Sequence, residues 1–195
     1  RNVTLTVYDG DKPIFSEFGE MLFTHFGVSG PLVLSASSHI RDMKPNLYHL
    51  AIDLKPALDS EQLDARIQRD FAENLNRDFI NGIRKLLPAK LIPVITRLSG
   101  IPEEQKINSV TKEQRRRFGE LIKAFPVRVS GFRPIDEAIV TSGGILVREI
   151  DPHTMESKLV RGLFFAGEVI DVDAYTGGFN LQIAFSTAYS AALYM

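Results

Sequence analysis

The hydrophobic pattern of this 195-residue sequence changes its period twice along the chain. At the start, Val3, Leu5 and Val7 alternate with more polar residues, and Asp9-Gly10-Asp11 offers a turn before a second run that ends at Phe18. Alternation with period two is typical of a half-buried strand. The beginning of the chain is therefore predicted to form a β-hairpin.

Three more elements are predicted before residue 60. Met21–Phe26 can add a third strand, and Pro31 stands behind Gly30 at a plausible first helical position. Because proline is tolerated in the first turn of a helix, a short helix through about His39 is expected. Tyr48–Leu54 again alternates and is predicted to be a strand.

The middle of the chain carries an apolar residue at every fourth position. These residues are Leu63, Ile67, Phe71, Leu75, Phe79, Ile83 and Leu87. The repeat predicts a long amphipathic helix behind Ser60, which is a candidate N-cap. A strict four-residue repeat overshoots the helical turn by about 40° at each step. We therefore expect a bend or break near Asn81-Gly82 and an end at Pro88.

Two further helices are predicted before residue 125. Lys90–Leu98 precedes Gly100, which suits a helix stop, and Thr111 with Gln114 forms a capping-box pattern for the next helix. The expected buried face of that last helix consists of Phe118, Leu121, Ile122 and Phe125. Residues 60–125 should thus be mainly helical.

The period returns to two after residue 126. The strand candidates are Val127 with Val129, Ala138–Val140, Ile145–Val147 and Leu163–Ala166, and a final helix should begin after Gly178. This order of strands, helices, strands and helix favours an α+β fold over repeated βαβ units. A domain boundary is predicted near residue 140.

Composition excludes several classes of function. The chain has 23 basic and 24 acidic residues, so its overall charge gives no reason to expect a nucleic-acid or membrane partner. It has no cysteine and four scattered histidines, which leaves no metal-ligand spacing. No apolar run approaches the roughly 20 residues needed to cross a bilayer. A cytoplasmic protein is expected.

A short apolar stretch from Gly162 to Glu168 ends in small residues and an acid. This pattern fits a buried parallel strand, and ligands bind beyond the carboxyl ends of such strands. Gly167 would let the backbone approach a ligand, and Glu168 could accept hydrogen bonds from ribose or ribityl hydroxyls. The alternative is that Glu168 is only a surface charge at the end of a strand.

Two glycine pairs flank that stretch. Gly177-Gly178 precedes a helix that starts with Phe179, Asn180 and Leu181, and its free N–H groups would favour an electron-rich partner such as a flavin edge. Gly143-Gly144 could let the main chain pass close to a flat ring. A simple turn explains either pair equally well.

The order of these motifs resembles a known family. Val140–Gly144, Glu149–Lys158, Gly162–Asp173 and Gly177–Ala184 follow one another as in bacterial FAD-dependent oxidoreductases of the aminoacetone oxidase type, and Gly19–Pro31 also resembles that family's pattern. The resemblance covers most of the chain and is weakest through the helical middle. It implies an insert domain over residues 1–140, followed at 141–195 by the last strands and helix of a glutathione-reductase-like FAD-binding domain.

The resemblance also implies a cofactor site and a chemistry. Glu168 corresponds to the acid near the FAD ribityl chain, and the residues near the flavin would be Gly143, Gly144, Gly167, Gly177, Gly178, Phe179, Asn180 and Leu181. The substrate would be a small molecule. Use of NAD(P)H is compatible with such a protein, but no motif in this segment supports it.

One motif of such proteins is absent from this sequence. No Gly-x-Gly-x-x-Gly follows a predicted strand, although that motif normally holds the FAD pyrophosphate. We therefore expect an N-terminal Rossmann segment as a partner of this chain, and we expect the 195 residues alone to bind FAD weakly or not at all. The alternative is a non-catalytic binding or lid module.

Other candidate sites carry less weight. His25 could donate a proton, but a single histidine is more often structural, and no catalytic residue is assigned. Gly27-Val28-Ser29-Gly30 does not match the Gly-x-Ser-x-Gly nucleophile elbow of hydrolases. Arg115-Arg116-Arg117 is interpreted as a solvated helix face rather than as a nucleic-acid site.

Overall fold

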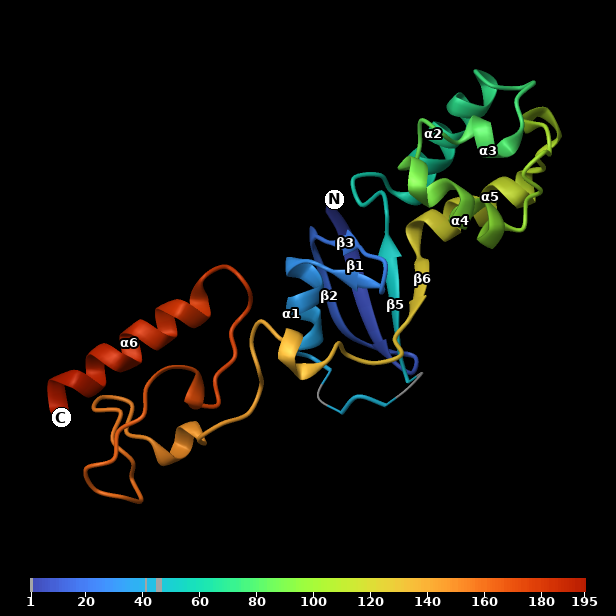
Figure 1. Cartoon of the computed structure of the whole chain (residues 1–195). Coiled ribbons are helices and arrows are strands. Elements are labelled where there is room, and N and C mark those ends of the chain that lie inside the picture. The colour runs from blue at the N-terminus through green and yellow to red at the C-terminus, as the bar shows by residue number, and fades with distance from the viewer. Residues whose placement is uncertain (1, 41, 45–46) are drawn as a thin grey trace. The chain divides into compact units, whose positions relative to one another are not determined.

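The computed structural model describes residues 2–40, 42–44 and 47–195 (Figure 1). Contacts within the chain define two compact units. Unit 1 comprises the described residues up to Met21 together with residues 47–130, and unit 2 comprises Leu22–Lys44 and Gly131–Met195. The predicted boundary near residue 140 stays a prediction, since a boundary between domains that fold separately is settled by a folding measurement.

Unit 1 is built on a four-stranded antiparallel sheet. Its strands are β1 (Asn2–Asp9), β2 (Lys12–Glu20), β5 (Tyr48–Asp53) and β6 (Phe125–Arg128). They lie in the order β2-β1-β5-β6, so that the hairpin strand β1 occupies an interior position. The predicted hairpin and the strand at Tyr48 are confirmed.

Alternation of side chains explains how the sheet forms a core. Val3, Leu5 and Val7 of β1 are all buried, as are Leu50 and Ile52 on β5. Leu5 pairs with Ile52 and Val7 with Leu50 across the two strands, so apolar residues from neighbouring strands share one face. A slip of one residue in this register would turn every one of these side chains to solvent.

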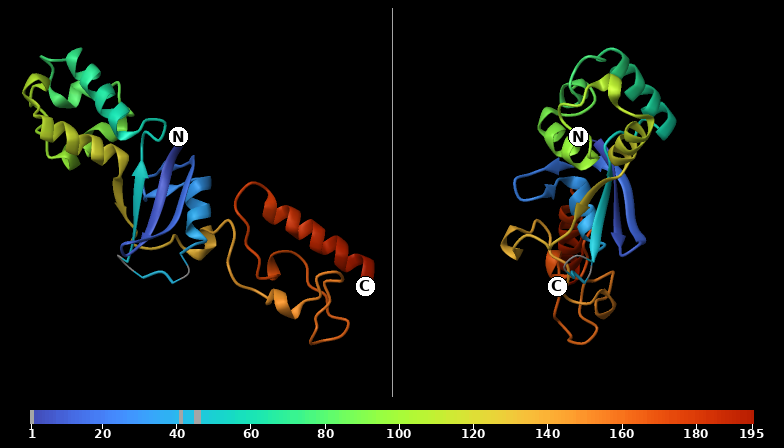
Figure 2. Two further views of the ribbon diagram at one scale, coloured as in Figure 1. Left: turned by 180° about the vertical axis from the view of Figure 1, so that it is seen from behind. Right: turned by 90° about the vertical axis from the view of Figure 1, so that its right-hand side faces the viewer.

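A helical region, residues 60–123, is inserted between β5 and β6 (Figure 2). It contains α2 (Ser60–Ala72), α3 (Phe79–Gly82), α4 (Ile92–Ser99) and α5 (Lys112–Lys123), with short 3₁₀ turns at Ala89–Leu91 and Ile107–Ser109. The prediction of a mainly helical middle is confirmed. Gly100 ends α4 in a left-handed conformation, with φ of 69°, as its position predicted.

The prediction of one long helix from Ser60 to Leu87 is wrong. Helix α2 already ends at Ala72, and its cap is Asp59, which forms a capping box with Gln62. Six residues separate α2 from α3, which ends at Gly82, where a break was expected. The four-residue apolar repeat does not require one helix, because separate short segments also bury Phe71 and Phe79 while Leu75 stays exposed.

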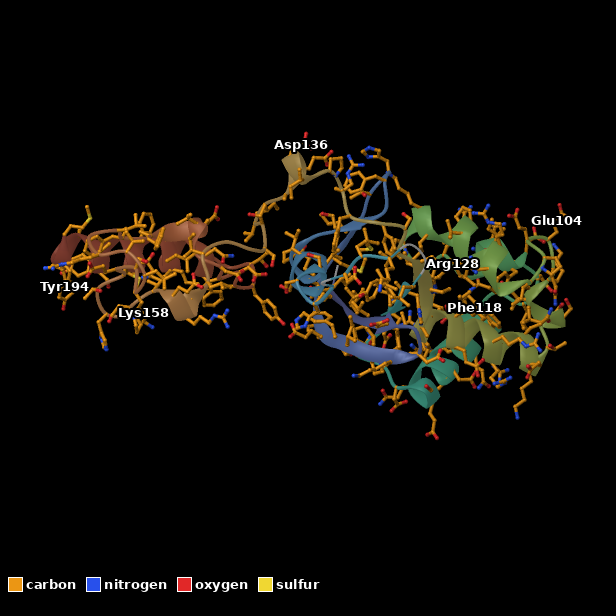
Figure 3. The ribbon with its side chains drawn as sticks, turned by 90° about the horizontal axis from the view of Figure 1, so that it is seen from below. Glu104, Phe118, Arg128, Asp136, Lys158 and Tyr194 are labelled. Carbon is orange, nitrogen blue, oxygen red and sulfur yellow. The ribbon has the colours of Figure 1, made fainter. Side chains whose placement is uncertain are left out.

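Aromatic residues form the centre of the helical region. Phe79 and Phe118 are fully buried, and their ring centroids lie 5.2 Å apart in an edge-to-face arrangement. Figure 3 labels Phe118 among these helices. Ile122 is buried with Phe118 as predicted, whereas Phe125 belongs to β6 and Leu121 is only half-buried.

The base of the helical region is fastened to the sheet by one lysine. Lys123 Nζ lies 2.5 Å from Asp53 Oδ2 and donates a hydrogen bond of 2.6 Å to the carbonyl oxygen of Leu58. The backbone N–H of Leu54 also donates to Ile122 O, at 3.0 Å. These contacts hold the two ends of the helical region side by side.

The predicted capping box of α5 is confirmed. Thr111 Oγ1 accepts from Gln114 N at 3.1 Å, and Gln114 Oε1 accepts from Thr111 N at 2.9 Å. We expect Thr111→Val to lower the free energy of unfolding by about 1 kcal/mol, because the Gln114 N–H loses its side-chain acceptor. Chemical denaturation with Thr111→Ser as the matched control tests this. Equal stability of the valine and serine variants would contradict it.

Unit 2 contains a small hairpin and three helical turns besides two helices. Strands β3 (Leu22–Phe23) and β4 (Val28–Ser29) pair, α1 (Pro31–Ser37) follows, and α6 (Phe179–Tyr194) ends the chain. The three 3₁₀ turns are Ile135–Glu137, Val147–Glu149 and Gly167–Val169. The helix at Pro31 is confirmed, whereas the strand predicted over Met21–Phe26 shrinks to two residues, because the chain turns back through Thr24 and Gly27.

Three predicted strands of unit 2 are wrong. Ala138–Val140, Ile145–Val147 and Leu163–Ala166 form no strands, and only single bridges join Ile145 to Ile170 and Phe164 to Glu156. A buried parallel strand needs hydrogen-bonded neighbours along its length, and among the described residues Leu163–Ala166 pairs only briefly with residues 155–157, in antiparallel orientation. The mixed α+β content is as predicted.

No helix among the described residues is both long and apolar enough to cross a membrane.

Candidate functional site

The predicted site residues all lie in unit 2, on three segments. The first contains Gly143 and Gly144, with φ of 102° and 154°. The Gly143 N–H donates to Asp171 Oδ1 at 3.1 Å, and Ile145 exchanges backbone hydrogen bonds with Val169 and Asp171 at 2.8 and 2.9 Å. The first glycine pair is thus held against residues 169–171.

Contacts with neighbouring backbone atoms of this chain leave no space for a side chain at Gly144. A Cβ atom at this position would lie 2.5 Å from the carbonyl oxygen of Val169 and 3.0 Å from Asp171 N. Backbone atoms cannot move aside as a flexible side chain can. The close passage of these two segments therefore requires a residue without a side chain. A Cβ on Gly143, by contrast, would meet no atom within 4 Å.

The second segment is the 3₁₀ turn that contains Gly167 and Glu168. The Gly167 N–H donates to Thr187 Oγ1 at 3.0 Å, so the turn is tied to the middle of α6. Glu168 is exposed, and among the described residues its carboxylate has no ion pair or hydrogen bond. The backbone turn is held by Thr187, and an exposed carboxylate without a partner can accept hydrogen bonds from an incoming hydroxyl group.

The third segment is the start of α6. Gly178 occupies the N-cap position with φ of 89°, no side chain caps the helix there, and a Cβ at Gly178 would meet no atom within 4 Å. The first N–H groups of any helix lack intrahelical acceptors. Among the described residues, α6 therefore begins with open space and no side-chain cap in front of it, as expected for a helix that starts after Gly178. A cofactor contact at this point stays a prediction.

Asn180 has a role in the structure that the sequence did not reveal. Its Oδ1 accepts from Ala174 N and its Nδ2 donates to Ala174 O, both at 2.8 Å. This pair of hydrogen bonds closes the loop that precedes α6. Phe179 and Leu181, the other two predicted residues here, are both exposed.

Backbone contacts of Ile145 with residues 169–171 join the first segment to the second, and the hydrogen bond from Gly167 N to Thr187 joins the second to the third. Among the described residues, none joins either glycine of the first pair directly to Gly177 or Gly178. Asp171 and Thr187, which hold the segments together, were not predicted. Thr187 could have been noticed as a hydroxyl on an apolar helix; it donates to Ile183 O at 2.7 Å.

A second unpredicted contact involves the loop before α6. The Tyr175 hydroxyl lies 2.5 Å from Nε2 of His39, which follows α1. Their separation of 136 positions in the sequence explains why no local pattern could reveal this contact. This contact places two polar groups near the loop that precedes α6.

The surface of α6 is apolar on several sides. Its exposed large side chains are Phe179, Leu181, Phe185, Tyr189, Leu193 and Tyr194. Phe185 is 70% exposed, and Tyr194 is labelled at the end of the helix in Figure 3. An open hollow of about 480 Å³ lies beside the C-terminal half, between Leu163, Phe165 and Ala191. This hollow is apolar and is distinct from the open space at Gly178.

The candidate residues that carried less weight in the sequence lie elsewhere in the structure. His25 is exposed and its ring meets Phe26 edge-on at 5.1 Å. Arg116 and Arg117 bind Glu113 and hold the pKa of its carboxyl at about 2, while Arg115 pairs with Asp64. These three arginines are thus compensated locally. Among the described residues, no cluster of His, Asp and Glu could hold a metal ion.

Comparison with known proteins identifies the family. Residues 1–140 match the model of a family described as "HI0933-like protein barrel and H2TH domain". The chain belongs to this HI0933-like family. The match includes the whole of unit 1 and therefore both the sheet and the helical region.

Three curated relatives extend the comparison beyond the helical region. A ribosomal RNA dihydrouridine synthase of Haemophilus influenzae is 32% identical over 98% of this chain, and the protein of that name from Escherichia coli is 33% identical over 88%. A 3-dehydro-bile acid delta(4,6)-reductase of Clostridium scindens is 29% identical over 93%. The chain spans 45%, 41% and 45% of the lengths of these three relatives.

Proposed function

We propose that this HI0933-like chain is the C-terminal portion of a cytoplasmic FAD-dependent oxidoreductase of the aminoacetone oxidase type. Residues 141–195 would complete a glutathione-reductase-like FAD domain whose Rossmann segment lies elsewhere in the complete protein. One observation carries the proposal: α6 begins at an uncapped glycine pair and exposes large apolar side chains on several sides. A helix of that kind is normally buried in a domain core.

The lengths and names of the relatives support this reading. Each is more than twice as long as the matched segment, which leaves room for a complete dinucleotide-binding unit. A dihydrouridine synthase adds two hydrogens to a uridine, and the bile acid relative is named a reductase. Reduction of a carbon–carbon double bond is the chemistry that these names share, and we extend it to this protein.

The residues present suit a flavin. Gly178 offers close approach to the electron-rich edge of the ring, the start of α6 offers N–H groups, and Glu168 offers an exposed carboxylate to the ribityl hydroxyls. A Cβ atom at Gly177 would lie 3.4 Å from the Phe179 ring, so the chain itself occupies the space beside that glycine. When bound, the flavin would supply hydride or electron transfer. Gly143 would lie at the ring, whereas the close contact of Gly144 with Val169 O already explains that glycine without a cofactor.

The chain's own residues would position the cofactor and shield it. Asn180 fixes the loop in front of the helix, so that the N–H groups of α6 keep one direction. Thr187 fixes the turn that carries Glu168. Fixed dipoles need no reorientation when negative charge develops nearby, which is how such groups lower a barrier. The apolar side chains of Phe179 and Leu181 would exclude water from the ring.

We expect the complete protein to be yellow and the 195-residue chain alone to be colourless. The reason is that the pyrophosphate anchor lies outside this segment. Absorption spectra of both purified proteins test this, and mass spectrometry of the heat-released cofactor distinguishes FAD from other flavins. Anaerobic bleaching of the spectrum by NADH or NADPH identifies the electron donor.

A colourless complete protein would overturn the proposal in favour of a non-catalytic binding or lid module. A yellow 195-residue chain with stoichiometric FAD would show that the site is not divided. The substrate is a small conjugated molecule or, as the names of two relatives suggest, a base in ribosomal RNA. Reoxidation of the reduced protein by a panel of conjugated small molecules tests the first of these.

A further inference from the structure

The charge of the chain is unevenly distributed, although its total is near zero. Residues 60–123 contain thirteen Lys and Arg against nine Asp and Glu, whereas the remainder contains ten against fifteen. The helical region therefore carries an excess of positive charge that the whole-chain balance hides. A basic surface of this kind attracts polyanions.

A polar pocket lies within this basic region. It has a volume of about 290 Å³, and we call it the Arg77 pocket; its lining residues are Asn76, Arg77, Asp78, Asn81, Arg84 and Lys106. Three cationic side chains thus face one carboxylate. Lys106 Nζ is paired with Asp78 Oδ1 at 2.7 Å, but among the described residues neither arginine has an ion-pair partner.

The walls of the Arg77 pocket are held by backbone hydrogen bonds between two segments. Phe79 N donates to Gln105 O at 2.8 Å, and Ile107 N donates to Arg77 O at 3.0 Å. Ile107 is buried against Gly82, where a Cβ atom would lie only 2.6 Å from the Ile107 Cδ1. The backbone that carries the arginines is therefore set before any ligand arrives, which reduces the entropy cost of binding.

The chemistry of the lining fits a phosphate group. Guanidinium groups donate paired hydrogen bonds to phosphate oxygens, and the asparagine amides can add neutral donors. A single free phosphate would need only the pocket, whereas residues 60–123 as a whole carry four more basic than acidic residues. That extent favours a ligand with many phosphates.

We propose that the Arg77 pocket binds a backbone phosphate of RNA and that the helical region is an RNA-binding surface. The choice of RNA rests on the proposed function, for which two relatives named for ribosomal RNA are a guide. Backbone contacts of this type fix the position of a nucleic acid without reading its sequence. The helical region would hold the RNA while another part of the protein acts on a base.

The test measures binding of a fluorescein-labelled RNA stem-loop to the complete protein by fluorescence anisotropy at several salt concentrations. We expect the double variant R77Q/R84Q to bind about tenfold more weakly or worse, with the slope of log affinity against log salt reduced by about 1 to 2. The matched control R116Q/R117Q removes the same charge from arginines that are already paired with Glu113, and should stay within about twofold of wild type.

A third variant is expected to strengthen RNA binding instead of weakening it. Asp78→Asn removes the carboxylate that neutralises Lys106, so RNA should bind about threefold more tightly at low salt. Loss of structure at the pocket would weaken binding instead.

Two outcomes overturn the proposal. One is equal weakening by the two double variants, and the other is binding of inorganic phosphate by a wild-type protein that does not bind RNA. The flavin spectrum is recorded on every variant and should not change. RNA binding and flavin content are separate measurements, so a colourless protein would contradict the proposed function and leave the binding result to be judged by itself.

Discussion

Gly144→Ala is expected to lower the free energy of unfolding of the complete protein by about 3 kcal/mol. Two effects add at this position. The backbone φ of 154° is strained for any residue with a side chain, and the new Cβ would overlap the carbonyl oxygen of Val169 at 2.5 Å. Relief would require residues 144 and 169 to separate, which breaks the hydrogen bond from Ile145 N to Val169 O.

Gly143→Ala is the matched control for that measurement. Its φ of 102° is also positive, but its Cβ would point into open space, so only backbone strain of about 1 kcal/mol is expected. Thermal unfolding of the cofactor-free proteins compares the two variants directly. Equal losses would show that the approach of residues 144 and 169 is not a constraint on the folded protein.

Replacement of Gly178 is expected to remove FAD from the complete protein, and the choice of replacement separates two causes. Valine at φ of 89° strains the backbone severely, whereas asparagine tolerates the left-handed region. Either side chain would project into the open space where the ring edge is proposed to lie. We therefore expect both variants to lose FAD affinity by about tenfold or more, and only Gly178→Val to lower the melting temperature of the apo form strongly.

The measurements are flavin content per protein, FAD affinity by fluorescence titration and thermal unfolding without cofactor. Normal FAD content in a stable Gly178→Asn protein would mean that the glycine pair serves only as a turn. Glu168 would then be the remaining specific candidate for cofactor contact. A Glu168→Gln variant could be examined in the same assays to test it.

Local patterns predicted the elements whose stabilising contacts are close in sequence. The hairpin around Gly10, the capping box of Thr111 and Gln114 and the left-handed stop at Gly100 follow from side chains within a few positions. The apolar repeat from Leu63 to Leu87 predicted one long helix wrongly, because a pattern of buried residues does not distinguish one helix from two. The capping box of α2 is also local: the Asp59 side chain accepts from Gln62 N, and the Gln62 side chain accepts from Asp59 N, so the cap lies one residue before the predicted Ser60.

The strands predicted in residues 138–166 failed for a different reason. An apolar run such as Leu163–Ala166 becomes a strand only when a neighbour supplies hydrogen bonds along its length, and here Phe164 has a single bridge. The candidate site showed the same difference between contacts that are close in sequence and contacts that are far apart. The turn at Gly178 was predicted from adjacent residues, whereas the links made by Asp171, Thr187 and Tyr175 span 20 or more positions.

The two ends of the helical region lie next to each other at the sheet, and this affects how such a protein can evolve. Residues 53 and 123 are held together by the Asp53–Lys123 ion pair, and β5 and β6 are neighbours in the sheet. A chain that leaves and re-enters a sheet at adjacent points can be lengthened, shortened or exchanged between those points without altering the strand order. Proteins built on this sheet could therefore acquire new binding specificities by exchanging residues 54–122, while the segment proposed to meet the cofactor stays the same.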